Sequence, residues 1–569
     1  MSYIFRDSGK ITASGSKYIT SITVRNVTVV PEYAFYKHTN LTSVTFSANI
    51  TSISEQAFSQ CGFTTFVVPS SVTSIAKGAF QGCSKLTSIN VPFVGGSKTN
   101  NRFIGYIFGA DDYTGNDDAV PASLKTVTVG SGTNVIPERG FYGCTNITTV
   151  NLTQSITKLE DRAFSQFPGL TQFTFPNSVT EVGGAAFANS TNLASVTFSS
   201  SVTTIGSLCF ENCTGLTSVI LPSNLDTIPF GMFRDCSSLS SITFPSCLTT
   251  IENNSFTGTG FTSLVIPDTV TSIGRSAFNN CPSLTSLTVP CLCKAGENNL
   301  FFGYMFGANS YDQTSSYIRN ELTKVILTGG LTHLTSETFY GCRYIENLTL
   351  PKTLTQIDRG ALSQLTKLSF ISIPFIGLDP TTTNENYFGE LFGYNKYSHE
   401  PQTGYIPADL DSVYVTGGNG ENRDFLPHYS FRGCKSIEVV DIDDNITEIG
   451  VSAFENCEEL RIAYLPKNCK TIGMGAFYFC QKLDMISFPT DSIEVIGSHA
   501  FFECDLLWGT ITFGTNLRVL GDYAFEAAGI YTSFGYTSFS YKGSQSEFNR
   551  KVDVGNNNDW ILEHLTFWK

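Results

Sequence analysis

Among the residue types that recur at a regular spacing in this sequence, cysteine can take part in the widest range of reactions. Eleven of the sixteen cysteines stand three residues after a phenylalanine or its equivalent. Where cysteine is absent, the same position holds one of six residues: His38, Phe167, Ser190, Thr259, Leu365 or Ala528. Tolerance of Phe, Leu and Ala predicts a buried position. We therefore expect a ladder of reduced, structural core thiols made by Cys61, Cys83, Cys144, Cys213, Cys236, Cys281, Cys342, Cys434, Cys457, Cys480 and Cys504.

Disulfides and metal binding are the other uses of thiols at a regular spacing. A repeat gives every cysteine two equivalent neighbours and no unique partner, so disulfides between adjacent repeats are the less favoured alternative. Cys291 and Cys293 follow Cys281 closely, but no histidine or further cysteine completes a zinc set. We expect neither a metal site nor a cofactor.

Catalytic groups are not marked by the sequence. Serine and threonine occupy the same outward slots in repeat after repeat, and the six histidines follow no shared frame that would single out a general base. Three aromatic-glycine segments, ending at Gly109, Gly307 and Gly393, lack the Lys and Ser/Thr of a phosphate-binding loop. We interpret them as aromatic plugs that brace a wide loop, and we expect no enzymatic activity.

One acidic run offers oxygen ligands for calcium: Asp111, Asp112, Asp117 and Asp118. The corresponding later segment carries Asn309, Ser310 and Thr314 in place of these carboxylates. The difference favours a solvated loop over a calcium site.

These residues belong to one repeat that runs through almost the whole chain. Thirteen of the sixteen gaps between marker residues are 22 to 24 residues long, and the other three, of 61, 61 and 69 residues, each contain an aromatic-glycine segment. The long gaps therefore predict enlarged coils rather than linkers, and about twenty coils in all. The markers are Phe35, Phe58, Phe80, Phe141, Phe164, Phe187, Phe210, Phe233, Phe256, Phe278, Phe339, Leu362, Phe431, Phe454, Phe477, Phe501 and Phe525.

Each coil reads as two short extended pieces closed by a tight Ala-Phe turn. Val44 and Phe46 alternate with Thr45, as in a strand with one buried face. So small a unit cannot bury its Leu, Ile and Phe alone, but stacking at about 4.8 Å gives a continuous core with parallel ladders. The predicted fold is an elongated, mainly β solenoid with short turns or helices at the Ala-Phe-x-x-Cys segments.

The chain therefore divides into an array and two caps. We expect an N-terminal cap at residues 1–20, the repeat array at 21–530 and a C-terminal cap at 531–569, because the end coils of a solenoid expose core. The enlarged coils are expected near residues 93–122, 291–320 and 375–408.

Composition excludes several classes of partner. The 49 acidic against 35 basic residues give a net charge of −14, which argues against nucleic acid and anionic membranes. No stretch approaches the roughly 20 apolar residues that a membrane-spanning helix needs, so we expect no membrane insertion. The N-terminal residues also lack the basic and apolar segments of an export signal.

The pattern Ala-Phe-x-x-Cys-x-x-Leu-Thr-Ser-Val-Thr-Phe-Pro, nearly intact from Phe233 to Ile251, resembles the BspA-like leucine-rich repeat of bacterial and protozoan surface proteins. The enlarged coils are similar to those in repeat proteins of gut Firmicutes. The resemblance implies a leucine-rich repeat solenoid that binds a protein or glycan on a host or neighbouring cell, located at a cell surface or outside the cell.

Two rival functions remain open at this point. A structural or receptor-binding component of a phage or virus particle would explain the missing export signal, with a virion or cytoplasmic location. A hydrolase site in the enlarged coils is the second alternative. The sequence leaves the oligomeric state undetermined.

A candidate ligand surface lies toward the C-terminus. The outward strand slots carry Thr and Ser in most coils, but this coating is lost from Glu438 onward, where the slots include Asp441, Arg461, Tyr464 and Asp484. A surface that loses its uniform coating is a plausible place for a specific ligand, and sequence drift near a terminus is the alternative interpretation. The enlarged-coil loops, with Tyr113, Tyr311 and Tyr397 at matching positions, are the alternative site.

Overall fold

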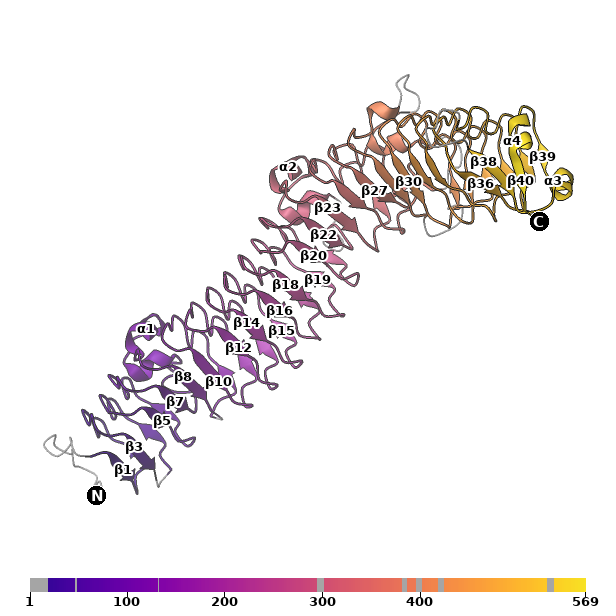
Figure 1. Ribbon diagram of the computed structural model, residues 1–569. Coiled ribbons are helices and arrows are strands. Elements are labelled where there is room, and N and C mark those ends of the chain that lie inside the picture. Colours follow the sequence, from indigo (N-terminus) through magenta and orange to yellow (C-terminus); the bar gives the residue numbers. More distant parts are fainter. Residues whose placement is uncertain are drawn as a thin grey trace. The chain divides into compact units, whose positions relative to one another are not determined.

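The computed structural model describes residues 19–46, 49–130, 132–293, 301–380, 386–395, 402–417, 424–529 and 537–568. Each ordinary repeat forms one coil of a β-solenoid, with a strand of three or four residues, a bend, a two-residue strand and a run of turns around the marker residue. The coils fall into two compact units, Met1–Thr262 with Ser272–Ser283, and Ser263–Thr271 with Leu284–Lys569. Within each unit, the strands lie side by side as successive rungs (Figure 1).

The longer strands form one face of each unit, and twenty-two of them lie within the described residues. They are β1 (Ser21–Val24), β3 (Ser43–Phe46), β5 (Thr65–Val67), β7 (Ser88–Val91), β8 (Thr126–Val129), β10 (Thr149–Leu152), β12 (Gln172–Thr174), β14 (Ser195–Thr197), β16 (Ser218–Ile220), β18 (Ser241–Thr243), β20 (Ser263–Val265), β22 (Ser286–Val289), β23 (Lys324–Leu327), β25 (Asn347–Thr349), β27 (Phe370–Ile373), β28 (Ser412–Val415), β30 (Val439–Ile442), β32 (Ile462–Tyr464), β34 (Met485–Ser487), β36 (Thr510–Phe513), β38 (Ser538–Tyr541) and β40 (Leu565–Phe567).

The two-residue strands form a second set of ladders on another side of the coils. They are β2 (Val29–Val30), β4 (Ser52–Ile53), β6 (Ser74–Ile75), β9 (Val135–Ile136), β11 (Lys158–Leu159), β13 (Glu181–Val182), β15 (Thr204–Ile205), β17 (Thr227–Ile228), β19 (Thr250–Ile251), β21 (Ser272–Ile273), β24 (His333–Leu334), β26 (Gln356–Ile357), β29 (Phe425–Leu426), β31 (Glu448–Ile449), β33 (Thr471–Ile472), β35 (Val495–Ile496), β37 (Val519–Leu520) and β39 (Asp553–Val554).

Neighbouring strands pair in parallel and in register, so equivalent residues of successive coils are Cα partners. Val196 pairs with Phe173 on one side and with Val219 on the other. These central residues are buried, whereas the Ser and Thr beside them are exposed. The expected mainly β solenoid with a period-2 pattern is confirmed, and the Ala-Phe-x-x-Cys segments form turns.

The marker phenylalanines stack on one another inside the core. Ring centroids of Phe141, Phe164 and Phe187 are 5.2 and 5.3 Å apart and nearly parallel. In the second unit, the rings from Phe431 through Phe525 stack at 4.7 to 5.1 Å. A backbone hydrogen bond runs beside each stack, as from Phe164 N to Ala186 O at 2.7 Å in the next coil. Ring stacking and backbone hydrogen bonding therefore fix the same coil-to-coil spacing.

In most of the Ala-Phe turns two residues adopt the left-handed conformation, one two positions before the marker and one two positions after it. The residue two positions after the marker is Gly143 (φ 71°) in one coil and Asn212 (φ 54°) in another. Glycine and asparagine tolerate a positive φ better than other residues do. Their frequency at this position therefore reflects the turn geometry.

The ladder cysteines lie in the core beside the phenylalanine stack. In most of these coils, the thiol donates a hydrogen bond to the carbonyl of the marker phenylalanine in the preceding coil, as from Cys236 to Phe210 O at 3.0 Å. Burial raises the pKa of these thiols, to about 12 for Cys457, so the S–H proton is retained at neutral pH. The hydroxyl of Ser190 makes the equivalent bond to Phe164 O at 2.9 Å. The slot therefore selects a small, buried hydrogen-bond donor.

Replacing Cys236 tests this dual role. Cys236→Ala removes both packing and the donor, and it should lower the stability of its coil by about 1–2 kcal/mol. Cys236→Ser keeps a donor of similar size, as at Ser190, and should cost less than the alanine variant. Chemical denaturation gives the cost, and hydrogen exchange should localise it to the altered coil and its neighbours. A serine variant that is less stable than the alanine variant would contradict the donor role.

The enlarged coils contain the few helices near the middle of the chain. Each aromatic-glycine segment forms a 3-10 helix, and its phenylalanines are buried, as expected for plugs. The helices are η2 (Ile104–Phe108), η3 (Tyr113–Gly115), α1 (Asn116–Ala119), η4 (Phe302–Phe306), η5 (Tyr311–Gln313), α2 (Thr314–Tyr317), η6 (Phe388–Phe392) and η7 (Gln402–Gly404).

A buried amide ties the first and third plugs to the following coil. The Asn116 side chain accepts a hydrogen bond from Gly105 N at 2.7 Å and donates one to Tyr142 O at 2.8 Å. Gln402 makes the same two bonds in the third enlarged coil. Thr314 occupies the equivalent place in the second, where its buried hydroxyl has no hydrogen-bond partner among the described residues.

Removing the amide bridge from the first plug and adding one to the second should have opposite effects on stability. Asn116→Leu removes two buried hydrogen bonds and should cost about 2–4 kcal/mol, because the backbone groups that they satisfy become unpaired. Thr314→Asn supplies the missing bridge and should gain about 1 kcal/mol. Denaturation together with hydrogen exchange at Ile104–Phe108 and Phe302–Phe306 measures both effects. A destabilised Thr314→Asn variant would show that the second plug does not use this bridge.

The first and last described strands continue the solenoid. β1 precedes the first marker and β40 follows the last, which accounts for two coils beyond the twenty that the markers predict. In the segment expected to be the C-terminal cap, β38 and β40 extend the longer-strand ladder and β39 extends the shorter one. Two helices, α3 (Gln545–Lys551) and α4 (Asp559–His564), lie between these strands in sequence. Among the described residues, no helix has the length and apolar character needed to cross a membrane.

Candidate binding surface

The Thr/Ser coating is interrupted on four neighbouring strands of the second unit. β28, β30, β32 and β34 are consecutive in a nine-stranded parallel sheet. In-register pairing makes Asp441 the Cα partner of Tyr414 on one side and of Tyr464 on the other. Ser487 of β34 completes the row beside Tyr464. A carboxylate therefore stands between two tyrosines, with neighbouring strands about 4.8 Å apart.

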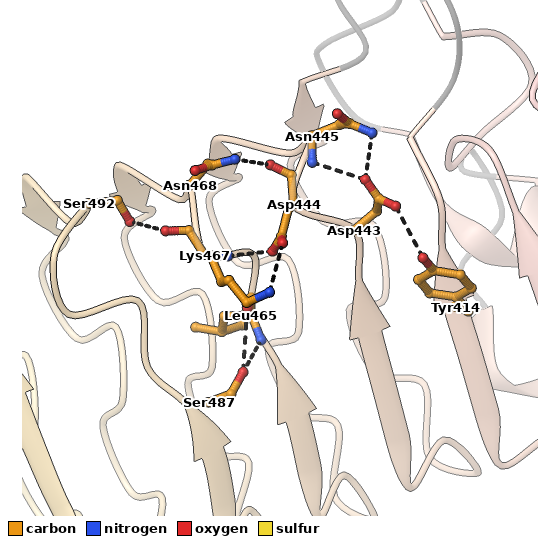
Figure 2. Close-up of polar contacts among 9 residues, drawn as sticks. All are labelled: Tyr414, Asp443, Asp444, Asn445, Leu465, Lys467, Asn468, Ser487 and Ser492. Atoms are coloured by element: carbon orange, nitrogen blue, oxygen red, sulfur yellow. Dashed lines mark hydrogen bonds and ion pairs between the residues drawn. The ribbon is translucent and has the colours of Figure 1, made fainter.

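An open groove of about 500 Å³ lies along this row, at the carboxyl ends of the strands. Its lining combines the outward residues of the strands with the loops that follow them. Figure 2 shows the polar contacts at its rim, from Tyr414 on β28 to Ser492 beyond β34. The groove is lined by Tyr414, Asp441, Ile442, Asp443, Asp444, Tyr464, Leu465, Lys467, Ser487, Phe488 and Pro489.

Two of the three aspartates in the groove are held by other side chains. Asp443 accepts a hydrogen bond from the Tyr414 hydroxyl at 3.1 Å, and its carboxylate lies 3.7 Å from the Lys352 ammonium (Figure 2 shows the first contact). Asp444 accepts bonds from the backbone N and the ammonium of Lys467 at 2.7 and 3.2 Å. Those contacts hold the pKa of Asp444 below its usual value.

Asp441 differs from both neighbours. Its carboxylate accepts a hydrogen bond from the backbone N–H of the adjacent Ile442, but it forms no ion pair with a basic side chain of the described residues. Partial burial, followed by the charges of Asp443 and Asp444, raises its pKa above the usual value. The groove therefore contains one carboxylate whose negative charge is not compensated by the chain itself.

The tyrosine rings on either side of Asp441 are also open to a partner. Tyr464 is 40% exposed, and neither it nor Tyr414 stacks on another aromatic ring in the described part of the chain. The hydroxyl bond to Asp443 fixes the position of the Tyr414 ring. The rings are therefore available for stacking, unlike the phenylalanines of the core.

The structure divides the four candidate residues into two pairs. Asp441 and Tyr464 line the groove, whereas Arg461 and Asp484 immediately precede β32 and β34, at the opposite ends of these strands. Arg461 forms an ion pair with Asp484 at 3.1 Å. Each of these two charges is thus already matched within the chain.

Most of the acidic run from Glu438 to Glu459 is neutralised in the same way. Glu455, Glu458 and Glu459 pair with basic residues that lie 23 positions away, at distances of 2.6 to 2.9 Å. Because one coil separates positions about 23 residues apart, the pairs bridge adjacent coils. The surface is therefore much less negative than the linear run indicates.

Tyr414 is a groove residue that the sequence analysis does not include among its candidates. It lies in the strand after the third enlarged coil, one coil before Glu438. Its slot carries Tyr rather than Thr or Ser, and this departure was a usable signal. Asp443, Asp444 and Lys467 follow strands rather than occupy strand slots, so the slot pattern could not select them.

The enlarged-coil loops use their notable side chains for internal contacts. Tyr113 packs edge to face on Tyr142 at 5.2 Å, and Tyr311 packs on Tyr340 in the same way. Asp111 pairs with Lys77, Asp112 caps Thr114, and Asp117 accepts from Thr145. Tyr397, the third tyrosine of this set, lies outside the described residues.

The histidines in the described ranges make structural contacts. The hydrogen bonds of His38, His333, His428 and His564 go to backbone groups or to Asp358, and none goes to a serine, threonine or cysteine side chain. Within those ranges, no group of three or more His, Cys, Asp or Glu side chains is arranged to hold a metal ion.

The raised pKa of Asp441 gives a pH-dependent prediction. Its ordinary value is near 3.8. A raised folded-state pKa means that protonated Asp441 stabilises the fold fully below that value, and that this contribution is lost as the pH rises through the folded-state pKa. Asp441→Asn should therefore raise the melting temperature at pH 7, and the gain should vanish as the pH falls below about 4.

Asp444→Asn is the matched control, and its sign is opposite. Because the pKa of Asp444 is lowered, the ionised carboxylate stabilises the fold above its ordinary pKa, and this contribution is lost on acidification. The asparagine variant should melt below the wild type at pH 7 and converge with it in acid. Thermal unfolding from pH 3 to 8 measures both variants, and a lowered melting temperature of Asp441→Asn at pH 7 would show that Asp441 is compensated.

Comparison with known proteins places the repeat in a family. The sequence matches the BspA type Leucine rich repeat region over residues 13–103, 121–239, 208–319, 306–391 and 421–534. Among solved structures, a leucine-rich repeat protein from Bacteroides ovatus is 22% identical, with 86% of this chain and 87% of that chain covered and a TM-score of 0.30. A leucine-rich repeat protein from Eubacterium ventriosum is 24% identical, with 47% and 83% covered and a TM-score of 0.29.

A leucine rich cell surface protein from Faecalibacterium prausnitzii is 17% identical, with 86% of this chain and 90% of that chain covered and a TM-score of 0.24. A comparison with curated protein sequences finds no match. The family match spans well over half of the chain and confirms the resemblance seen in its repeats. The chain belongs to the BspA-type leucine-rich repeat family.

Proposed function

We propose that the chain is a non-enzymatic binding scaffold of a microbial cell surface, and that it holds a protein partner on the outer face of β28, β30, β32 and β34. The observation that carries the proposal is the groove, in which an uncompensated carboxylate stands between two unstacked tyrosines. It lies where the Thr/Ser coating of the array is interrupted. The cell-surface location is supported by the family and by the likeness to the cell surface protein of Faecalibacterium prausnitzii.

Binding accounts for the groove better than catalysis does. Its lining contains neither histidine nor cysteine. Its one serine, Ser487, accepts a hydrogen bond from Leu465 N at 2.8 Å and donates one to Leu465 O at 3.4 Å, so its hydroxyl is bonded to backbone and not to a carboxylate of the lining. A serine nucleophile requires an adjacent base, so hydrolysis has no support from these residues.

A protein partner fits the chemistry of the groove. Tyrosine is enriched at the energetic centres of protein interfaces, where its ring contributes apolar contact area and its hydroxyl contributes a hydrogen bond. Ion pairs lie at both ends of these strands, Lys467 with Asp444 beside the groove and Arg461 with Asp484 at the opposite strand ends. A groove between such polar borders can accept an extended or loop segment of a partner across several strands.

Selection from a phage-displayed library of random 12-residue peptides, panned on the intact chain, tests the proposal. Tyr414→Thr combined with Tyr464→Thr restores the ordinary coating at both positions. We expect the selected peptides to bind this double variant at least tenfold more weakly than the wild type, as measured by calorimetry with synthetic peptides.

Ile220→Thr is the matched control, because Ile220 is 70% exposed and occupies the same outward slot on β16. It should leave peptide affinity unchanged, which would show that the loss requires the groove rather than any exposed apolar side chain. Peptides that bind the double variant as tightly as the wild type would place the binding surface elsewhere and overturn the proposal.

A further inference from the structure

We infer that the groove receives an arginine side chain, with its guanidinium paired to Asp441 and stacked between the rings of Tyr414 and Tyr464. This inference rests on the proposed function, since it names the group of the partner that the binding face recognises. It draws on three features of the groove: the order of side chains across the strands, the one uncompensated charge and the open ring faces.

The order of side chains across the strands favours a cation-binding position above Asp441 on β30. Asp441 has Tyr414 and Tyr464 as its Cα partners on the two sides, so the three side chains rise in parallel from neighbouring strands. A carboxylate supplies an anion, and an aromatic ring supplies a negative π face. A cation that enters above Asp441 meets both attractions at once.

Charge accounting within the groove singles out Asp441. Lys467 neutralises Asp444, and Asp443 is engaged by Tyr414, Asn445 and Lys352. Asp441 has only the backbone N–H of Ile442, and no basic side chain of the described residues pairs with it. A cationic ligand would therefore remove a charge repulsion that the free protein carries, and the same reasoning disfavours an acidic ligand.

The shape of the site favours arginine over lysine. A guanidinium is planar, stacks on aromatic rings and donates two parallel hydrogen bonds to one carboxylate. An ammonium is a compact and strongly hydrated charge that cannot stack in this way. A calcium ion is also a poor occupant, because it takes six to eight oxygen ligands, and two of the three carboxylates in the described lining, Asp443 and Asp444, already have lysine partners.

Direct titration with N-acetylarginine methylamide, followed by ligand-observed NMR on the intact chain, tests the inference without a natural partner. The uncharged citrulline analogue has almost the same shape and should bind at least tenfold more weakly. The lysine analogue should bind at least threefold more weakly than the arginine probe. Equal affinity for the arginine and citrulline probes would overturn the inference.

Variants locate the probe on the groove. Asp441→Asn should weaken arginine binding at least tenfold, and the variant is expected to remain folded because it removes an uncompensated charge. Glu448→Gln is the matched control, since Glu448 is an exposed carboxylate of the same coil on β31 and outside the groove. Tyr464→Phe should retain affinity and Tyr464→Leu should lose it, because only the former keeps the ring face. Unchanged affinity in Asp441→Asn would overturn the inference.

The two proposals can fail separately. Library peptides that depend on the two tyrosines, combined with an arginine probe that binds no better than citrulline, would leave the binding face intact and remove its arginine specificity. An arginine probe that depends on Asp441, combined with peptides that ignore the face, would instead establish a guanidinium site and remove the proposed protein-binding role.

Discussion

The coil-to-coil contact of the marker phenylalanines is the interaction on which the rest of this structure depends. In the ordinary coils these rings stack on their equivalents in adjacent coils, and a backbone hydrogen bond from each phenylalanine N–H to the carbonyl of the residue before the next marker holds the same spacing. The left-handed turn residues and the buried thiols beside the stack serve this contact. Because the contact repeats in register, each outward position of a strand lies next to the equivalent positions of the neighbouring coils. The residues that line up on the surface can therefore be predicted from the repeat alignment.

The repeat period was enough to predict the fold. It did not predict the side-chain hydrogen bonds that join neighbouring coils. Spacing and alternation were enough to assign parallel strands and buried markers. The thiol bond to the preceding phenylalanine was missed, although Ser190 and Thr259 in the same slot indicate a donor. The amide bridges of Asn116 and Gln402 were missed as well, because each joins residues from different coils and neither belongs to the repeat pattern.

The candidate site was half predictable for the same reason. Asp441 and Tyr464 depart from the coating in known slots, so slot comparison found them. Arg461 and Asp484 depart from it too, but their ion pair shows that an unusual residue in a slot can be matched by its neighbour one coil away. A linear acidic run is likewise a poor guide to surface charge in a solenoid, since partners such as Arg432 and Glu455 are 23 residues apart in sequence.

The groove itself follows from unequal side-chain size across neighbouring strands. A row of threonines gives a flat surface, whereas the sequence Tyr414, Asp441, Tyr464 and Ser487 alternates large and small side chains over four strands. The hollow therefore forms without any change in the backbone or in the phenylalanine stack beneath it. In a fold stabilised mainly by contacts between adjacent coils, such changes to outward slots have local consequences. The repeat can thus accommodate an unusual row of outward residues, including a carboxylate without a basic partner among the described residues, while its core remains the same as in the coils that carry the Thr/Ser coating.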